Sequence, residues 1–181
     1  MKLEKFTVKD IIFVAVMAAA VSICGMFTMP LVMNIDLFGL RNMASAIIYA
    51  LFCMITIMKV KKPGALSLLG LLCGFVVLMM APVMFWSIFL AALLSDIITF
   101  IFFRGFHSDK AKVFAATLFI PMSLPFTLIF SMLLNGKSFG EVVEKSALSI
   151  VFCFGTVVLS YAGAKIGQKI GKELQKAGKL S

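Results

Sequence analysis

The chain has 181 residues, of which 62% are hydrophobic and only 14% charged, and its mean hydropathy is +1.10. A soluble domain is about half apolar, so this composition excludes an ordinary soluble protein and predicts one that crosses a membrane several times. The formal net charge is +9. Because the basic residues stand in short clusters between long apolar runs, this charge indicates membrane topology and not a nucleic-acid-binding surface.

Six apolar runs, separated by prolines, glycines and charged loops, predict six membrane-spanning helices. The runs cover residues 9–28, 40–58, 64–80, 83–103, 112–134 and 145–165. A helix of about 20 residues crosses a hydrocarbon core of about 30 Å, and the third run is short for such a crossing. The break at Pro82 is the weakest, because a proline can kink a membrane helix without ending it. The predicted fold class is an all-α membrane bundle.

Small side chains recur at steps of three and four residues in the first run, and therefore share one face of the predicted helix. They are Ala15, Ala18, Ala19, Ser22 and Gly25. Such a stripe lets another helix approach closely inside a bilayer, and the partner is either a helix of this chain or a separate protein. The run resembles a signal peptide, but its apolar character continues to residue 33, so we expect it to be retained.

The distribution of basic residues predicts the orientation in the membrane. With six spans, both termini and the loops near Lys61 and His107 lie on one side and hold 14 of the 17 basic residues. The other side has only Arg41, Lys137 and Lys145. By the positive-inside rule, both termini are expected in the cytoplasm. Merging the third and fourth runs would place the basic loops on opposite sides, so the asymmetry also favours a break between these two runs.

The chain is expected to divide into a membrane domain, residues 1–165, and a basic amphipathic tail, residues 166–181. In this tail, lysines occupy one helical face and isoleucine and leucine another, a pattern typical of a helix that lies against the inner leaflet. Two sets of glycines at steps of four residues are expected to form packing seams inside the bundle. The first set is Gly70 and Gly74, and the second is Gly163, Gly167 and Gly171.

Residue types that carry catalysis are scarce in this sequence. His107 is the only histidine, so the chain alone offers neither a Ser-His pair in the membrane nor an HExxH zinc site. The four cysteines lie in apolar runs without a CxxC pair, as expected of small buried hydrophobic residues. A glycine-rich phosphate-binding sequence is also absent. The chain is therefore not expected to be an enzyme or to hold a metal or another cofactor.

Polar side chains near the predicted extracellular face are the candidates for binding a small solute. Amide and charged groups can line the mouth of a helical bundle, with an aromatic ring to stack against the solute. The candidates are Asn34, Asp36, Arg41, Asn42, Trp86 and Asn135. In the competing interpretation, Trp86 is an interfacial anchor, and Asp36 and Arg41 only solvate a loop.

Asp96 lies inside the fourth apolar run, where an isolated carboxylate is costly. Its small and hydroxyl-bearing neighbours predict a face that packs inside the bundle. We expect hydrogen bonding to Asp96 within the bundle, and the alternative is a coupling contact with a partner on the cytoplasmic side. In the fifth run, Pro121 and Pro125 predict a kinked helix, which is common where a bundle opens around a cavity.

Three stretches of the chain resemble the substrate-binding S components of energy-coupling factor (ECF) transporters, in particular the MptD-type subfamily. They are KVKKPGALSLLGLLCGF at residues 59–75, LLSDIITF around Asp96, and GAKIGQKIGKELQKAG near the carboxyl end. The chain length, the alanines of the first helix and the absence of an ATP-binding sequence fit the same family.

The resemblance implies a division of labour among subunits. An S component captures a vitamin or a related micronutrient at the extracellular face and docks on a separate transmembrane T subunit, which two cytosolic ATPases drive. In that family the alanine face of the first helix is the docking surface, and Ala15 and Ala19 match its motif. We extend the surface to Ala18 and Ser22 by their spacing. The resemblance also implies a multi-pass protein of the bacterial cell membrane.

Two hypotheses from different classes follow. In the first, the chain is the solute-capturing subunit of an ATP-driven importer. In the second, it is a membrane scaffold or assembly protein without a transport role, and its small-residue stripes serve only helix packing.

Overall fold

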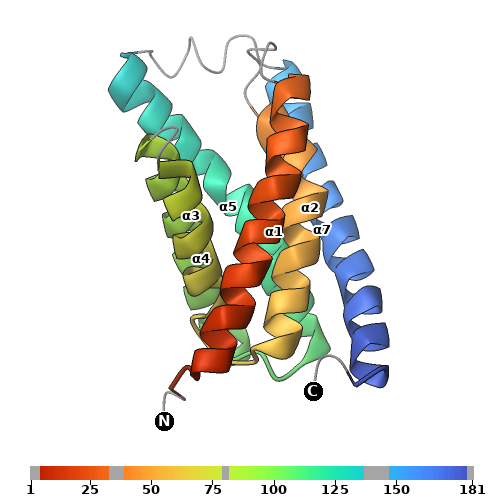
Figure 1. The fold of residues 1–181 in the computed structure, drawn as a ribbon. Helices are drawn as coiled ribbons and strands as arrows, with labels where there is room; N and C mark the ends of the chain where they lie inside the picture. Colours follow the sequence, from red (N-terminus) through yellow and green to blue (C-terminus); the bar gives the residue numbers. More distant parts are fainter. Residues whose placement is uncertain (1–4, 33–38, 79–81, 137–146, 179–181) are drawn as a thin grey trace.

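A computed structural model describes residues 5–32, 39–78, 82–136 and 147–178, and all regular secondary structure in these ranges is helical (Figure 1). The helices are α1 (Val8–Val32), α2 (Leu40–Lys59), α3 (Ala65–Leu78), α4 (Pro82–Phe103), α5 (Asp109–Asn135) and α7 (Ala147–Lys176). Successive helices run in alternating directions, so α1 begins and α7 ends at the same end of the bundle (Figure 1). We call this the basic end, and the opposite end the distal end.

Five of the six helices are long and apolar enough to cross a membrane. The exception is α3, which has 14 residues. A helix of that length rises about 21 Å, which is less than a hydrocarbon core of about 30 Å. The predicted all-α, multi-pass class is therefore confirmed, and the third of the six predicted crossings falls on a helix that is short for a complete span.

Two predicted helix ends differ from those of the structure. Pro30 does not end the first helix, since α1 continues through it to Val32. A proline so close to the end of a membrane helix removes only one backbone hydrogen bond, so the helix tolerates it. The sixth apolar run, predicted to end at residue 165, belongs to a helix that continues without interruption from Ala147 to Lys176, so the predicted basic tail begins within α7. The division into a membrane domain and a basic tail stays a prediction.

The helices α2 and α7 pack against each other through the glycines predicted to form a seam. A Cβ atom added at Gly163 would meet the backbone of Ile47, with only 2.9 Å to its Cα. One at Gly167 would lie 2.6 Å from the carbonyl oxygen of Leu51. Since only glycine fits at such positions, this seam is internal packing, as predicted.

A second seam joins α3 to α4. A Cβ atom added at Gly70 would collide with the side chain of Ala92, and one at Gly74 would lie 2.8 Å from the ring of Phe85. Both predicted glycine sets therefore bring helices of the same chain together. The α3–α4 seam pairs glycine with side chains, whereas the α2–α7 seam brings two backbones into direct contact.

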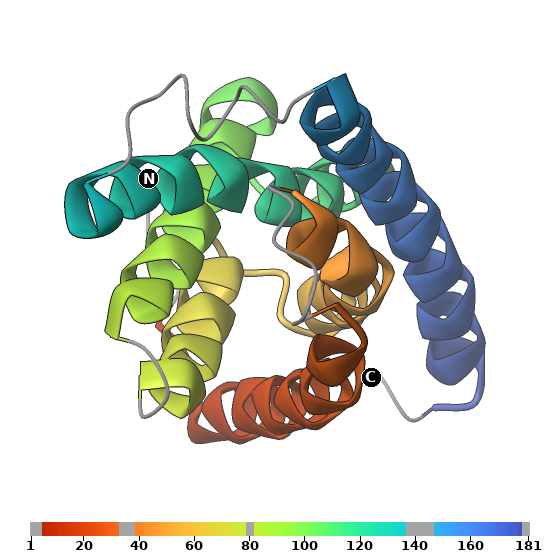
Figure 2. The same ribbon diagram turned by 90° about the horizontal axis from the view of Figure 1, so that it is seen from above.

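Figure 2 shows α2 near the centre of the bundle, where it contacts α1, α3, α5 and α7. Its buried residues include Cys53, Met54 and Ile57, which belong to one apolar core together with Leu66 and Phe119. By contrast, α1 lies at the edge of the bundle and packs mainly on α2 and α3 (Figure 2). Its window of membrane-crossing residues is the least buried of the five.

Ion pairs hold the helices together at the basic end. Thr7 and Asp10 exchange hydrogen bonds between side chain and backbone N–H in both directions, at 2.9 and 3.3 Å, which forms a capping box for α1. The same carboxylate pairs with Lys62 of the α2–α3 turn at 2.8 Å. This lysine also donates to the carbonyl oxygen of Lys5 at 2.9 Å. The first turn of α1 is therefore anchored to the turn that follows α2.

Candidate functional site

Two polar side chains from different helices meet between α2 and α5. Asn42, in the first turn of α2 at the distal end, donates from Nδ2 to the Oγ of Ser123 at 2.8 Å. Ser123 in turn donates to the carbonyl oxygen of Ile120 at 2.7 Å. Asn42 is half-buried and Ser123 is buried. An amide held in this way has a fixed orientation, which a solute-binding group needs.

Ser123 lies between the two prolines of α5, in a helix that continues through both of them. Pro121 and Pro125 lack the N–H that would close a helical hydrogen bond, so carbonyl oxygens are released in this stretch. Thr127 donates from its hydroxyl to the carbonyl oxygen of Ser123 at 2.8 Å. These hydroxyl bonds reach the carbonyl oxygens of Ile120 and Ser123, whereas the carbonyls that lose a helical donor are those of Thr117 and Pro121, four residues before each proline.

The remaining candidates for solute binding have varied positions. Arg41 is half-buried and has an interaction partner. Trp86 is 50% exposed, and its ring makes an edge contact with Phe85 of its own helix at 5.2 Å between centroids. Asn135 ends α5, but its side chain lies outside the part of the chain that the structure describes. Asn34 and Asp36 lie wholly outside that part. Among the candidates, the structure thus joins Asn42 to a neighbouring helix.

Ser123 was not among the predicted site residues. Its pairing with Asn42 joins positions 81 residues apart, and no local pattern in one sequence reports such a contact. The available signal was its place between two prolines in an otherwise apolar helix, because an intramembrane hydroxyl at a kink usually faces another helix or a cavity.

The small-residue stripe of α1 is divided between two environments. Ala18 and Ser22 are only 2% and 9% exposed, whereas Ala15 and Ala19 are exposed. The hydroxyl of Ser22 donates to the carbonyl oxygen of Ala18 at 2.8 Å, and the thiol of Cys73 in α3 lies 3.9 Å from the same oxygen. Ala18 and Ser22 therefore pack inside the chain, which corrects our extension of the docking surface to them.

The exposed face of α1 is almost entirely apolar. Besides Ala15 and Ala19, it presents Ile12, Val16 and Ile23. In a bilayer this face contacts either lipid chains or another membrane protein. The two alanines form a shallow strip between larger side chains, and a partner helix can approach closest there.

Asp96 is 6% exposed and bonds to the start of α3. Its Oδ2 accepts a hydrogen bond of 2.7 Å from the backbone N–H of Ser67 and one of 2.6 Å from the Ser67 hydroxyl. A carboxylate at this position satisfies a backbone donor of the first helical turn and interacts favourably with the helix dipole. The expected hydrogen bonding within the bundle is therefore present, and the coupling role of Asp96 stays a prediction.

No family model matches the chain. The curated proteins and the solved structures also give no match. Within the described residues, no group of three or more histidine, cysteine, aspartate or glutamate side chains is placed to hold a metal ion.

Proposed function

We propose that this chain is a solute-binding S component of an ECF-type importer. In this proposal it captures a vitamin or a related micronutrient at the extracellular face and docks on a T subunit energised by two cytosolic ATPases. The chain would reside in the bacterial cell membrane with both termini in the cytoplasm, so that the basic end faces inward. ATP hydrolysis would occur in the partner subunits.

The observation that carries this proposal is the position of Ala15 and Ala19. These alanines match the docking motif of the family, and they lie on the exposed face of the helix at the edge of the bundle. Packing inside the chain does not account for Ala15 and Ala19, because Ala18 and Ser22 are the buried small residues on the side of α1 that packs against α3. An exposed small-residue strip leaves room for a partner helix.

Solute capture is assigned to the distal end, around Asn42. Its amide is fixed by Ser123 and lies between α2 and the proline-containing part of α5. A small polar molecule could exchange hydrogen bonds with Asn42 and Arg41 there, and Trp86 supplies an exposed aromatic ring at the start of α4.

Docking is tested by Ala15→Trp and Ala19→Trp. Each substitution places a large ring in the strip and is expected to abolish co-purification with the T subunit and its ATPases, because the partner helix can no longer approach. Solute affinity should stay unchanged, as the distal end is untouched. The measurement is a pull-down from detergent-solubilised membranes of cells that express the whole importer.

Ile101→Trp is the matched control for these variants. Ile101 is also exposed, but it lies on α4 and not on the face of α1 that presents Ala15 and Ala19, so its variant should still assemble. Assembly of all three variants would refute the docking surface. If the wild-type chain co-purifies with no ATPase-bearing module, the scaffold hypothesis replaces the transport hypothesis.

The solute is identified by a thermal-shift screen of the purified chain against water-soluble vitamins and their precursors. A ligand at 100 times its dissociation constant adds about 2.7 kcal/mol to the stability of the folded state. For the compound that gives the largest shift, Asn42→Ala should weaken binding, while the docking variants should bind like the wild type. A compound that stabilises Asn42→Ala as much as the wild type would place the solute elsewhere.

A further inference from the structure

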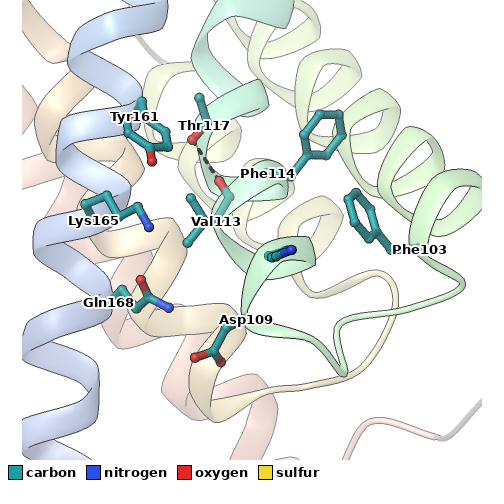
Figure 3. A pocket seen from close by; sticks show the side chains of 9 residues that line it. Phe103, Asp109, Val113, Phe114, Thr117, Tyr161, Lys165 and Gln168 are labelled. Carbon is teal, nitrogen blue, oxygen red and sulfur yellow. Dashed lines mark hydrogen bonds between the residues drawn. The ribbon is translucent and has the colours of Figure 1, made fainter.

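A hollow lies on the flank of the bundle near the basic end, between α5 and α7 (Figure 3). Its volume is about 470 Å³. Nine residues from α4, α5 and α7 line it: Phe103, Asp109, Lys110, Val113, Phe114, Thr117, Tyr161, Lys165 and Gln168. Figure 3 shows Tyr161, Lys165 and Gln168 on one wall, with Val113, Thr117 and Asp109 on the facing helix.

The electrostatic balance of this hollow is positive. Its only carboxylate, Asp109, is already paired with Lys172 at 2.7 Å and with Lys112 at 3.5 Å. Lys110 and Lys165 also line the hollow, and neither forms a salt bridge with any residue that the structure describes. Lys165 places its ammonium 5.5 Å from the centre of the Tyr161 ring. Two uncompensated ammonium groups in one hollow favour an anionic occupant.

The remaining lining is apolar and aromatic. Phe103 of α4 contacts Phe114 of α5 at 5.4 Å between ring centroids, and both rings are partly exposed. Toward the distal end, α7 continues with exposed Val158 and Phe154. An occupant that binds the lysines therefore has exposed apolar surface beside it, toward the distal end.

We propose that this hollow binds the headgroup of an anionic phospholipid. Lys110 and Lys165 would hold the phosphate, Gln168 would donate to a headgroup oxygen, and the acyl chains would lie along the exposed apolar side chains of α7. A phospholipid matches both the positive charge and the adjoining apolar surface, whereas an acidic protein segment would match only the charge. The site lies away from Ala15, Ala19 and Asn42, so it does not depend on the proposed transport function.

The test compares lipid binding to the purified full-length chain in detergent micelles. The probes are dioleoylphosphatidylglycerol and dioleoylphosphatidylcholine, titrated separately and followed by native mass spectrometry. We expect the wild type to bind the anionic lipid at least about tenfold more tightly. The double variant Lys110→Gln/Lys165→Gln should lose about 10- to 30-fold in affinity for the anionic lipid, because each lysine near an anionic headgroup contributes roughly one decade or less.

The matched control is Lys61→Gln/Lys176→Gln, which removes the same charge from exposed positions of the basic end outside the hollow. It should retain the wild-type affinity within about threefold. An equal loss in both double variants would show only diffuse attraction to the basic end and overturn the site. Unchanged lipid binding by Lys110→Gln/Lys165→Gln would also overturn the site. That conclusion would hold even if this variant lost binding to an acidic protein partner.

Discussion

The α2–α7 interface and the exposed face of α1 both contain small residues at helical spacing, yet these residues lie in different surroundings. At Gly163 and Gly167 the backbones of two helices touch, and no room remains for a Cβ atom. At Ala15 and Ala19 the small side chains are exposed. Small-residue spacing thus marks where a helix can approach, and the structure distinguishes a position already filled by the chain from one that is open.

The largest expected effect breaks the filled interface. In Gly163→Ala, the new methyl group collides with the backbone of Ile47, which cannot move without separating α2 from α7. We expect a loss of about 2 to 3 kcal/mol in the free energy of unfolding in detergent, measured by chemical denaturation followed by circular dichroism.

Gly25→Ala in α1 is the matched control. A Cβ atom there would lie 3.8 Å from the hydroxyl of Tyr49, which is ordinary contact. Because alanine favours the helix by about 1 kcal/mol over glycine, this variant should be as stable as the wild type or more stable. Equal destabilisation by both substitutions would contradict the distinction between a filled interface and a loosely packed helix.

A smaller effect tests the start of α3, one of the two helices against which α1 packs. Asp96→Ala leaves the backbone N–H and the hydroxyl of Ser67 without their acceptor at the start of α3. We expect a cost of about 2 kcal/mol, again measured by denaturation in detergent.

Ser67→Ala is the comparison for Asp96→Ala. It removes one of the two hydrogen bonds but keeps the bond from the backbone N–H, so it should cost less, about 1 kcal/mol. If Ser67→Ala were the more damaging of the two, Asp96 would not be the group that satisfies the start of α3.

The smallest expected effect is local to α1. Asp10→Asn removes the ion pair between Asp10 and Lys62. Both side chains are less than one-fifth exposed. A partly exposed pair of this kind contributes about 1 kcal/mol or less. We expect faster hydrogen exchange in the first turns of α1 and no change in α2 or α7, measured by mass spectrometry. Faster exchange throughout the bundle would show that α1 is not an independently anchored edge helix.

Much of the fold was predictable because helices in a membrane depend on long apolar runs. The start of α2 at Leu40 and the end of α4 at Phe103 coincide with the predicted limits. The glycine seams were also predictable, since glycines at steps of four residues in an apolar helix have few other uses. The extension of α7 to Lys176 was missed because the change from apolar to lysine-rich sequence resembled a domain boundary.

The orientation of each helix about its own axis was not predictable. In a soluble helix, polar residues mark the outer face, but in α1 nearly every residue is apolar and the buried and exposed faces have the same chemistry. The sequence therefore placed Ala15 and Ala18 on one face, although one is exposed and the other buried. The contact between Asn42 and Ser123 was missed for a related reason, because it depends on which sides of α2 and α5 meet.

The unequal lengths of α3 and α7 have a consequence for the surrounding bilayer. With 14 and 30 residues, these helices rise about 21 and 45 Å, and the two views place them on opposite sides of the bundle (Figures 1 and 2). The last part of α7 is lysine-rich, so its extra length does not add to the apolar surface, whereas α3 is shorter than a hydrocarbon core of about 30 Å. A span that is too short is accommodated by local thinning of the membrane. The bilayer is therefore expected to be thinner beside α3 than beside α7.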